Sequence, residues 1–170
     1  MLQDILTDKK SLFADGVHTE LRGQINRNRR IVLLNGDVVG NVRSEQSGIS
    51  ARVYRGGVYG FSSTAEYNNE AAEMVLKAAA ENAAFMDKHA GIGKPALPAM
   101  PQKQLPVQED IRDCEQKIYA DFAKEIDAYI VKNCPKLVSR LVVSMEDSME
   151  KLIVTSDAAS GHILAPRSYV

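Results

Sequence analysis

Histidine is a common metal ligand in proteins, and the chain has three, His18, His89 and His162. A zinc site needs side chains that converge on one point, and no two of these histidines lie within helical reach. His18-Thr19-Glu20 has the HxE pattern of zinc deaminases, but the PCxxC partner of that pattern is absent. The sequence therefore predicts no metal site, and we interpret His18 as a strand residue.

The other reactive side chains lack the neighbours that their chemistry needs. Gly91–Lys94 matches part of a phosphate loop, but Pro95 stands where that motif requires Ser or Thr and then a helix. The hydroxyl cluster Ser62–Thr64 has no GxSxG elbow around it, so we expect it to end a strand and cap the following helix. Glu146-Asp147 fits a solvated turn. The sequence predicts no catalytic, metal-binding or cofactor-binding residue.

Composition and charge narrow the class of protein. The 170 residues carry 21 basic and 22 acidic side chains, so nucleic-acid binding is not expected of the chain as a whole. Arg27, Arg29 and Arg30 form a small basic cluster, which we interpret as a solvated strand face. No segment reaches the about 18 apolar residues of a membrane span, and the N-terminus lacks the order of a signal peptide. Cys114 and Cys134 do not form a CxxC motif, and we expect a cytoplasmic protein.

Apolar and polar residues alternate from Val17 onward, which is typical of a half-buried sheet. Turn signals at Asn35-Gly36, Ser47-Gly48 and Arg55–Gly57 divide this stretch. Turns this short can join only antiparallel neighbours. The sequence therefore predicts a short helix over residues 1–13, followed by an antiparallel meander with strands at 18–26, 30–34, 38–46, 49–54 and 58–62.

Two helices are expected to cover the strands. The first, Glu70 to Lys88, is capped at Asn68-Asn69 and repeats small and apolar residues every three or four positions. The second starts near Glu109-Asp110 and ends at Asn133–Pro135. Its predicted apolar stripe consists of Ile111, Cys114, Ile118, Phe122, Ile126 and Ile130.

The predicted fold class is α+β, with antiparallel meanders that are each covered by a helix, in two similar halves. The first unit spans residues 1–90, a proline-rich linker spans 91–108, and the second unit spans 109–170 with strands at 137–146, 149–156 and 162–170. A turn is expected at Asp147-Ser148. Because the last strand stops without a closing turn, we expect a chain that is truncated at this end.

Several segments together resemble the TldD/PmbA family, also called modulators of DNA gyrase. They are Glu20–Arg22, RRIVLLNG at 29–36, SEQSGISARV at 44–53, GVYGFSST at 57–64, Ile153–Asp157 and Ala165–Arg167. Gly57–Thr64 is the closest match, since the family has a similar run before an alanine-rich helix. The Gly60–Thr64 order is more similar to the TldD branch than to the PmbA (TldE) branch.

The resemblance implies the N-terminal domain of a zinc metallopeptidase that acts on unfolded or precursor peptides with a PmbA/TldE-like partner subunit. In that family an HExxxH helix supplies zinc ligands and general base, and this sequence has no HExxxH. Zinc is therefore expected in the full-length protein, and no residue here inherits a catalytic role. Gly60, Phe61, Ser62, Ser63 and Thr64 are predicted to contact the peptide or the partner. The alternative is a stand-alone module that binds peptides or proteins without enzymatic activity.

Overall fold

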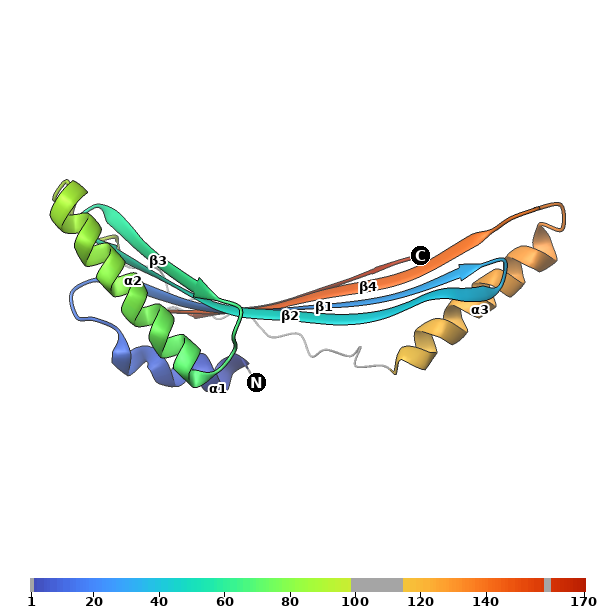
Figure 1. The fold of residues 1–170 in the computed structure, drawn as a ribbon, viewed down its shortest axis with the longest axis horizontal. Helices are drawn as coiled ribbons and strands as arrows, with labels where there is room; N and C mark the ends of the chain where they lie inside the picture. Colours follow the sequence, from blue (N-terminus) through green and yellow to red (C-terminus); the bar gives the residue numbers. More distant parts are fainter. Residues whose placement is uncertain (1, 99–114, 158–159) are drawn as a thin grey trace. The chain divides into compact units, whose positions relative to one another are not determined.

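The fold is known from a computed structural model that describes residues 2–98, 115–157 and 160–170. Three α-helices, a 3-10 helix and five strands follow one another within these ranges (Figure 1). Their order is α1 (Leu2–Thr7), η1 (Asp8–Leu12), β1 (His18–Leu34), β2 (Asp37–Arg55), β3 (Val58–Thr64), α2 (Asn69–Ala90), α3 (Gln116–Asn133), β4 (Leu141–Thr155) and β5 (Ser160–Tyr169). The predicted α+β class is confirmed.

The strands form one sheet in the order β3-β2-β1-β4-β5, and neighbouring strands run antiparallel. The turn between β1 and β2 is Asn35-Gly36, whose φ angles of 53° and 94° are both positive. A two-residue turn of this kind matches the right-handed twist of a hairpin, so the predicted turn is confirmed. Gly56 and Gly57 likewise have positive φ between β2 and β3.

The strands are longer than the sequence indicated. β1 runs without a break through the predicted gap at residues 27–29, and β2 runs through Ser47-Gly48, where a turn was expected. Gly48 has another role there, because a Cβ at this position would come within 2.9 Å of the Thr64 carbonyl oxygen. β4 runs through Asp147-Ser148, so the predicted hairpin at this point is wrong.

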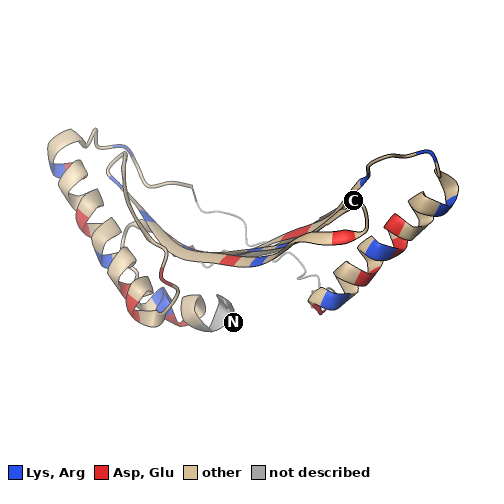
Figure 2. Ribbon diagram, turned by 45° about the vertical axis from the view of Figure 1, so that its right-hand side comes forward, with Lys and Arg blue, Asp and Glu red and all other residues tan. Residues whose placement is uncertain are grey.

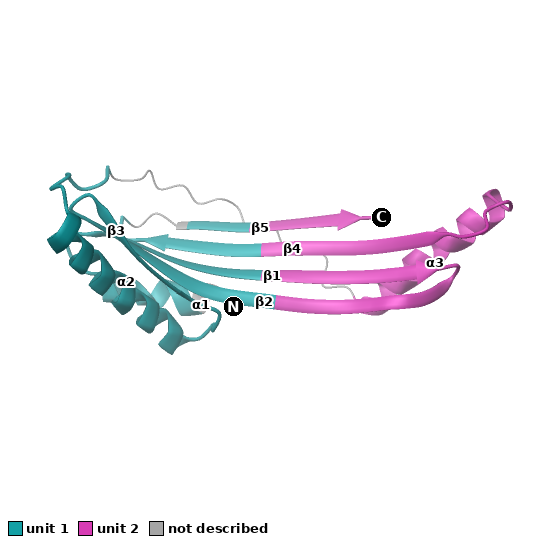
Figure 3. Cartoon of the chain, turned by 45° about the horizontal axis from the view of Figure 1, so that its top comes forward, with its two compact units in different colours: residues 1–25, 46–107, 150–163 teal, residues 26–45, 108–149, 164–170 magenta. Residues whose placement is uncertain are grey.

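The chain divides into two compact units, and each draws on three stretches of sequence (Figure 3). Unit 1 consists of residues 1–25, 46–107 and 150–163, and unit 2 of residues 26–45, 108–149 and 164–170. β1 passes from unit 1 into unit 2 after Ile25. The predicted boundaries at residues 90 and 108 stay a prediction. Residues 99–108 of the expected linker lie outside the described residues, and 91–98 form no helix or strand.

Unit 1 holds the larger core. α1 and α2 pack on one face of its strands, where α2 contributes mostly alanines and the strands contribute branched side chains. The fully buried members include Leu6, Leu21, Ile49, Val75 and Val154. Small side chains on α2 let the helix axis approach the sheet closely.

Unit 2 has a smaller core beneath α3. Ile31 and Leu33 of β1, Ala123 of α3 and Val142 of β4 are its buried apolar members, and half-buried Tyr119, Ala120, Ile126 and Ile130 pack around them. Ile118 and Phe122 are 55% and 47% exposed, so the stripe predicted for this helix is partly wrong. Ile111 and Cys114, the other early members of that stripe, lie outside the described residues.

The helix ends follow from local chemistry. Asn68 is the N-cap of α2, and its side chain accepts a hydrogen bond of 2.7 Å from the backbone N–H of Ala71. α3 ends at Asn133, as predicted.

Both signs of charge are interspersed along α2 and α3 (Figure 2). Among the described residues, no helix combines the length and the apolar composition that crossing a bilayer requires.

Candidate functional site

The five predicted contact residues lie together at the end of β3, which is an edge strand of the sheet. β3 pairs with β2 alone, in the register Gly60 with Val53, Ser63 with Ser50 and Thr64 with Ile49. An edge strand presents backbone groups that another strand can bind. The structure therefore places the segment where a partner chain or a peptide could add to the sheet.

Gly60 is needed for close packing inside unit 1. A Cβ on this residue would overlap the Ala79 carbonyl oxygen and the Ala83 nitrogen of α2. Gly60 is buried, whereas Phe61 next to it is 58% exposed. The small residue thus lets a backbone approach closely, but that backbone belongs to α2 of the same chain. By strand alternation, Phe61 and Ser63 lie on the opposite face from Gly60.

Two neighbours satisfy polar groups at this end of β3. The Asn82 side chain of α2 donates a hydrogen bond of 3.0 Å to the carbonyl of Phe61. The Thr64 hydroxyl accepts a hydrogen bond of 3.3 Å from the backbone of Glu66. Thr64 therefore stabilises the turn after the strand, and the helix cap itself is Asn68. The prediction that this hydroxyl ends the strand is confirmed. The prediction that it caps the helix is wrong, because Asn68 is the cap.

A chain of charged residues lies on β1 and β2 in unit 1. His18 Nδ1 is 3.2 Å from Asp157 Oδ2, and its Nε2 is 3.2 Å from Glu20 Oε1. Arg52 donates to both oxygens of Glu20, with N–O distances of 2.8–3.1 Å. The Arg52 guanidinium also lies 5.0 Å from the ring centroid of Tyr59 on β3. The cluster thus connects three strands of unit 1 with the segment after β4.

The charges in this cluster act on Glu20. Burial raises the pKa of Glu20, but hydrogen bonds and charge attraction from Arg52 and His18 lower it further than burial raises it, so the pKa lies below its ordinary value. The hydrogen bond to Glu20 raises the pKa of Arg52. Glu20 is therefore a stable anion near neutral pH, which suits a structural or binding role and does not suit a proton donor.

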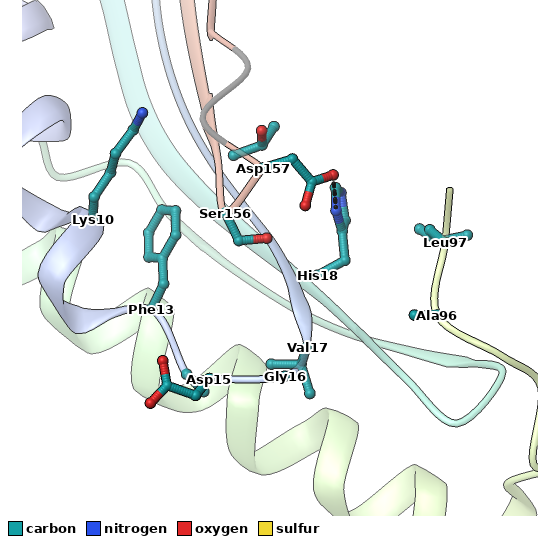
Figure 4. A pocket seen from close by; sticks show the side chains of 12 residues that line it. Lys10, Phe13, Asp15, Gly16, Val17, His18, Ala96, Leu97, Ser156 and Asp157 are labelled. Carbon is teal, nitrogen blue, oxygen red and sulfur yellow. Dashed lines mark hydrogen bonds and ion pairs between the residues drawn. The ribbon is translucent and has the colours of Figure 1, made fainter. Parts of the chain in front are cut away.

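A cavity of about 440 Å³ lies beside this cluster (Figure 4). Its polar lining includes Lys10, Asp15, His18, Ser156 and Asp157, and its apolar lining includes Phe13 and Leu97. Ser156 is engaged in the fold, because its hydroxyl accepts a hydrogen bond of 3.1 Å from the backbone of Thr19. Sequence reasoning missed this cavity, since its lining residues come from four separate stretches. The HxE spacing was the one signal, and it pointed to His18 alone.

Zinc does not fit the described part of the chain. Residues 2–98, 115–157 and 160–170 contain no cluster of three or more His, Cys, Asp or Glu side chains that could hold a metal. Each ring nitrogen of His18 faces a different carboxylate, and His162 Nε2 lies 3.1 Å from Glu150 Oε1. A zinc ion needs three or four ligands that point at one centre, and these pairs diverge.

The arginine cluster and Glu146, which the sequence also singled out, lie in different surroundings in the structure. Arg27 pairs with Glu45 at 2.9 Å, and Arg29 is buried with its guanidinium 5.4 Å from the Tyr119 ring centroid. The three arginines thus do not form one basic surface. Glu146 is buried and accepts a hydrogen bond from Tyr119, so it is not a turn residue.

The stretch after α2 contacts the turn between β2 and β3. Ile92 and Lys94 both donate backbone hydrogen bonds to the Gly56 carbonyl, which holds residues 91–94 against the turn between β2 and β3. These backbone N–H groups therefore bind a carbonyl of the same chain, whereas those of a phosphate loop bind a phosphate. Cys134 is a free, exposed thiol.

Comparisons with known proteins identify the architecture. Residues 19–83 match the family model described as PmbA/TldA metallopeptidase domain 1. No curated protein sequence gives a significant match. The solved structures that match include TldE from Thermococcus kodakarensis, with a TM-score of 0.70 and 10% identity over 99% of this chain.

Two further structures have the same fold. They are proteins from Thermotoga maritima and Bacteroides thetaiotaomicron that are described as candidate modulators of DNA gyrase. Each has a TM-score of 0.66 over 98% of this chain, with 16% and 14% identity respectively. This chain spans 37% or 38% of the length of these three structures.

Proposed function

We propose that this chain is the non-catalytic N-terminal domain of a TldD-type zinc metallopeptidase, because residues 19–83 match the model of the first PmbA/TldA metallopeptidase domain. The observation that carries the proposal is this family match, which covers β1, β2, β3 and most of α2. Its substrates would be unfolded or precursor peptides. The domain would shape the substrate chamber and the interface with a partner subunit, in the cytoplasm.

Hydrolysis is assigned to a part of the full-length protein other than residues 1–170. The sequence contains no HExxxH, and the described residues do not converge as zinc ligands. In the full-length protein, zinc would polarise the peptide carbonyl and lower the pKa of its bound water. The role of this chain would be to bind, orient and enclose the peptide. Such positioning contributes to catalysis without any reacting group.

The edge strand β3 is the surface that best fits this role. Phe61 and Tyr59 are 58% and 45% exposed on it, and both lie on the face away from α2. An added strand gains main-chain hydrogen bonds from the edge and side-chain contacts from alternate residues. We assign Gly60, Phe61, Ser62, Ser63 and Thr64 to this surface, with a peptide or a PmbA/TldE-like subunit, or a second copy of the full-length protein, as the bound partner.

The first experiment tests for the peptidase. The gene is sequenced beyond the codon for Val170, and the full-length protein is purified for zinc analysis and for cleavage of an unfolded peptide. We expect an in-frame HExxxH, stoichiometric zinc and cleavage that stops when zinc is removed by a chelator. A stop codon after Val170 together with a metal-free, inactive protein would contradict the proposal and favour the stand-alone binding module.

The second experiment tests the β3 surface in the full-length protein. Ser63→Trp places a bulky group on the exposed edge, and we expect at least a several-fold loss of peptide cleavage or of partner association. Ser168→Trp is the matched control, because Ser168 is an exposed serine on β5, the other edge strand. Equal activity of the two variants would remove β3 from the proposed surface.

A further inference from the structure

The first half of β2 forms a free edge of the sheet within unit 2. β3 pairs with β2 only from Ile49 to Arg55, and no other described strand lies on that side of β2. Residues 37–48 therefore present backbone groups to which another strand can bind. This stretch contains no lysine and no proline, two residues that natural edge strands commonly use to prevent such pairing.

The hairpin between β1 and β2 determines which backbone groups point to this edge. The residues that flank a two-residue turn form a hydrogen-bonded pair, so Asp37 directs its backbone groups to β1. Because these directions alternate along the strand, the groups of Val38, Gly40 and Val42 point away from β1. In agreement, the Gln116 side-chain nitrogen approaches the Val42 carbonyl oxygen from outside, at 3.5 Å. A contact of this length is weak, so the carbonyl can still accept from another strand.

The side chains of this stretch are exposed to solvent. Val38, Val39 and Val42 are 47%, 59% and 50% exposed. Asp37 and Arg43 are exposed as well, and neither forms an ion pair or a side-chain hydrogen bond with a described residue. The edge thus combines apolar side chains with two charges of opposite sign that have no partner within the described part of the chain.

This stretch is complementary to a second copy of itself. When two β2 strands run antiparallel with Gly40 opposite Gly40, Val38 lies opposite Val42 and Asp37 lies opposite Arg43 of the other copy. The two-fold axis repeats both pairs on its other side. The backbone directions agree with this register, because residues that point to the edge lie opposite one another. Opposite charges and apolar side chains that face each other across strands are both favourable pairs.

Neighbouring registers lack this complementarity. A shift by one residue would place backbone groups that point to the edge opposite groups that point to β1, so the interstrand hydrogen bonds could not form. A pair centred on Asn41 would keep the backbone directions, but it would place Asp37 opposite Glu45. Like charges that lie directly opposite each other are destabilising. The charges therefore favour the register that is centred on Gly40.

We propose that two copies of this chain associate through residues 37–43 of β2, in an antiparallel pair centred on Gly40 that continues the sheet from one copy into the other. Such a pair satisfies backbone groups at the edge and removes the valine side chains from water. A two-fold pair of this kind is closed, so it gives a dimer and not a fibre. The inference goes beyond the proposed function and does not depend on zinc, on cleavage or on the β3 surface.

The test exchanges the two charges, and sedimentation equilibrium of the purified protein measures the dissociation constant of the dimer. Asp37→Arg and Arg43→Asp each turn two attractive pairs into repulsive ones. We expect each single variant to raise the dissociation constant by about tenfold or more. The double variant, Asp37→Arg with Arg43→Asp, restores opposite charges across the pair and should return the constant to within about threefold of the wild-type value.

Asp121→Arg is the matched control, because it makes the same change of charge at an exposed residue of α3. It should leave the dissociation constant unchanged. A wild-type protein that stays monomeric, single variants that dimerise as tightly as the wild type, or a double variant that does not recover would each overturn the proposal.

Two further measurements identify the occupant of this edge. A monomeric wild-type protein whose complex with a PmbA/TldE-like subunit is weakened by Asp37→Arg would assign the edge to that subunit, and self-association would be wrong. Ser63→Trp, the variant that tests the β3 surface, should leave the dimer intact. Failure of the self-association and failure of the proposed function can therefore be told apart.

Discussion

Gly60 has a role that is set by the backbone of α2 rather than by its own conformation. A methyl group at this position would overlap backbone atoms of Ala79 and Ala83, which cannot rotate away as a side chain could. We predict that Gly60→Ala lowers the free energy of unfolding by about 3 kcal/mol, the upper part of the range for overpacked cores. Chemical denaturation measures this change.

Gly161 provides the control for that substitution. A Cβ on Gly161, in β5, would meet no atom within 4 Å, and its φ is not positive. Gly161→Ala should therefore change the free energy of unfolding by less than about 1 kcal/mol, with stabilisation possible through the unfolded chain. Equal losses in the two variants would show that the contact between β3 and α2 is not as close as described.

Glu20 makes the stability of unit 1 depend on pH in a definite direction. Its pKa in the folded protein is lowered, so the folded state stabilises the carboxylate relative to the unfolded chain. This contribution is complete above the pKa of the unfolded carboxyl, about 4.3, and is lost as pH falls through the lower folded value. We predict that the wild-type protein loses more stability than Glu20→Gln between pH 6 and the acid limit of folding.

The size of that effect is limited by solvent. The Arg52 side chain is 50% exposed, so the ion pair contributes at most about 1 kcal/mol. A double-mutant cycle with Glu20→Gln and Arg52→Gln should give a coupling energy of this size at pH 7 and a smaller one at pH 3. A coupling energy that does not change with pH would contradict the assignment.

The sequence drew attention to Gly60–Thr64 but could not assign the role of each residue. Small residues beside an aromatic indicated a close backbone approach, and the structure shows that α2 makes this approach. Thr19 and Asp157 could not be found in this way, because their roles depend on neighbours that are distant in sequence. The Thr19 backbone pairs with Ser156, which is 137 residues away in the sequence, and Asp157 lies against His18, from which 139 residues separate it.

At the scale of elements, the helices could be predicted more closely than the strands. Asn68, the alanine pattern and Asn133–Pro135 define helix ends through local hydrogen bonds and sterics. Strand ends depend on partners. Asp147-Ser148 has the composition of a turn, yet Ser148 is buried and Glu146 bonds to Tyr119 of α3, so β4 continues through it.

The spacing of the apolar residues in α3 also failed to predict which face of the helix is buried. Apolar residues lie on more than one side of the helix. Ile118, Phe122 and Tyr129 are exposed, whereas Tyr119, Ala123 and Ile130 pack inward. Asp127 is buried on the inward side because Arg140 pairs with both of its oxygens, at 2.6 and 2.9 Å. The ion pair of Asp127 with Arg140 therefore helps to determine which face of α3 points inward, which the apolar pattern did not predict.

Arg140 connects α3 to the β1–β2 turn as well. Its backbone N–H donates to the Asn35 side chain, and its carbonyl accepts from the Asn35 nitrogen, both at 2.9 Å. We predict that Asp127→Ala increases amide hydrogen exchange in α3 and around Asn35, because removing one partner leaves the other without its bidentate contact. Exchange in α2, which belongs to unit 1, is the internal reference and should stay unchanged.

At the scale of the whole molecule, the two units bury very different cores. Among the residues that the structure describes, the unit 1 cluster contains thirteen buried apolar residues (Leu6, Leu21, Ile49, Ala51, Val53, Ala71, Ala72, Val75, Leu76, Ala79, Ala83, Leu152 and Val154), whereas the unit 2 cluster contains four. Hydrophobic burial is the main favourable contribution to folding and is roughly proportional to the apolar area removed from water. Unit 2 thus has much less stabilisation of its own, although β1, β2 and β4 run through both units.

This difference predicts the order in which the protein opens. Native-state hydrogen exchange should show α3 amides exchanging through openings of lower free energy than those of α2, because regions with few buried apolar contacts open locally before the whole fold does. At rising denaturant, exchange of α3 should remain controlled by local opening while α2 follows global unfolding. Identical protection in both helices would mean that the shared strands make the two cores a single cooperative unit. If the β3 surface is occupied by a partner, the added protection should appear first in β3 and α2, since Gly60 and Asn82 hold these two elements together.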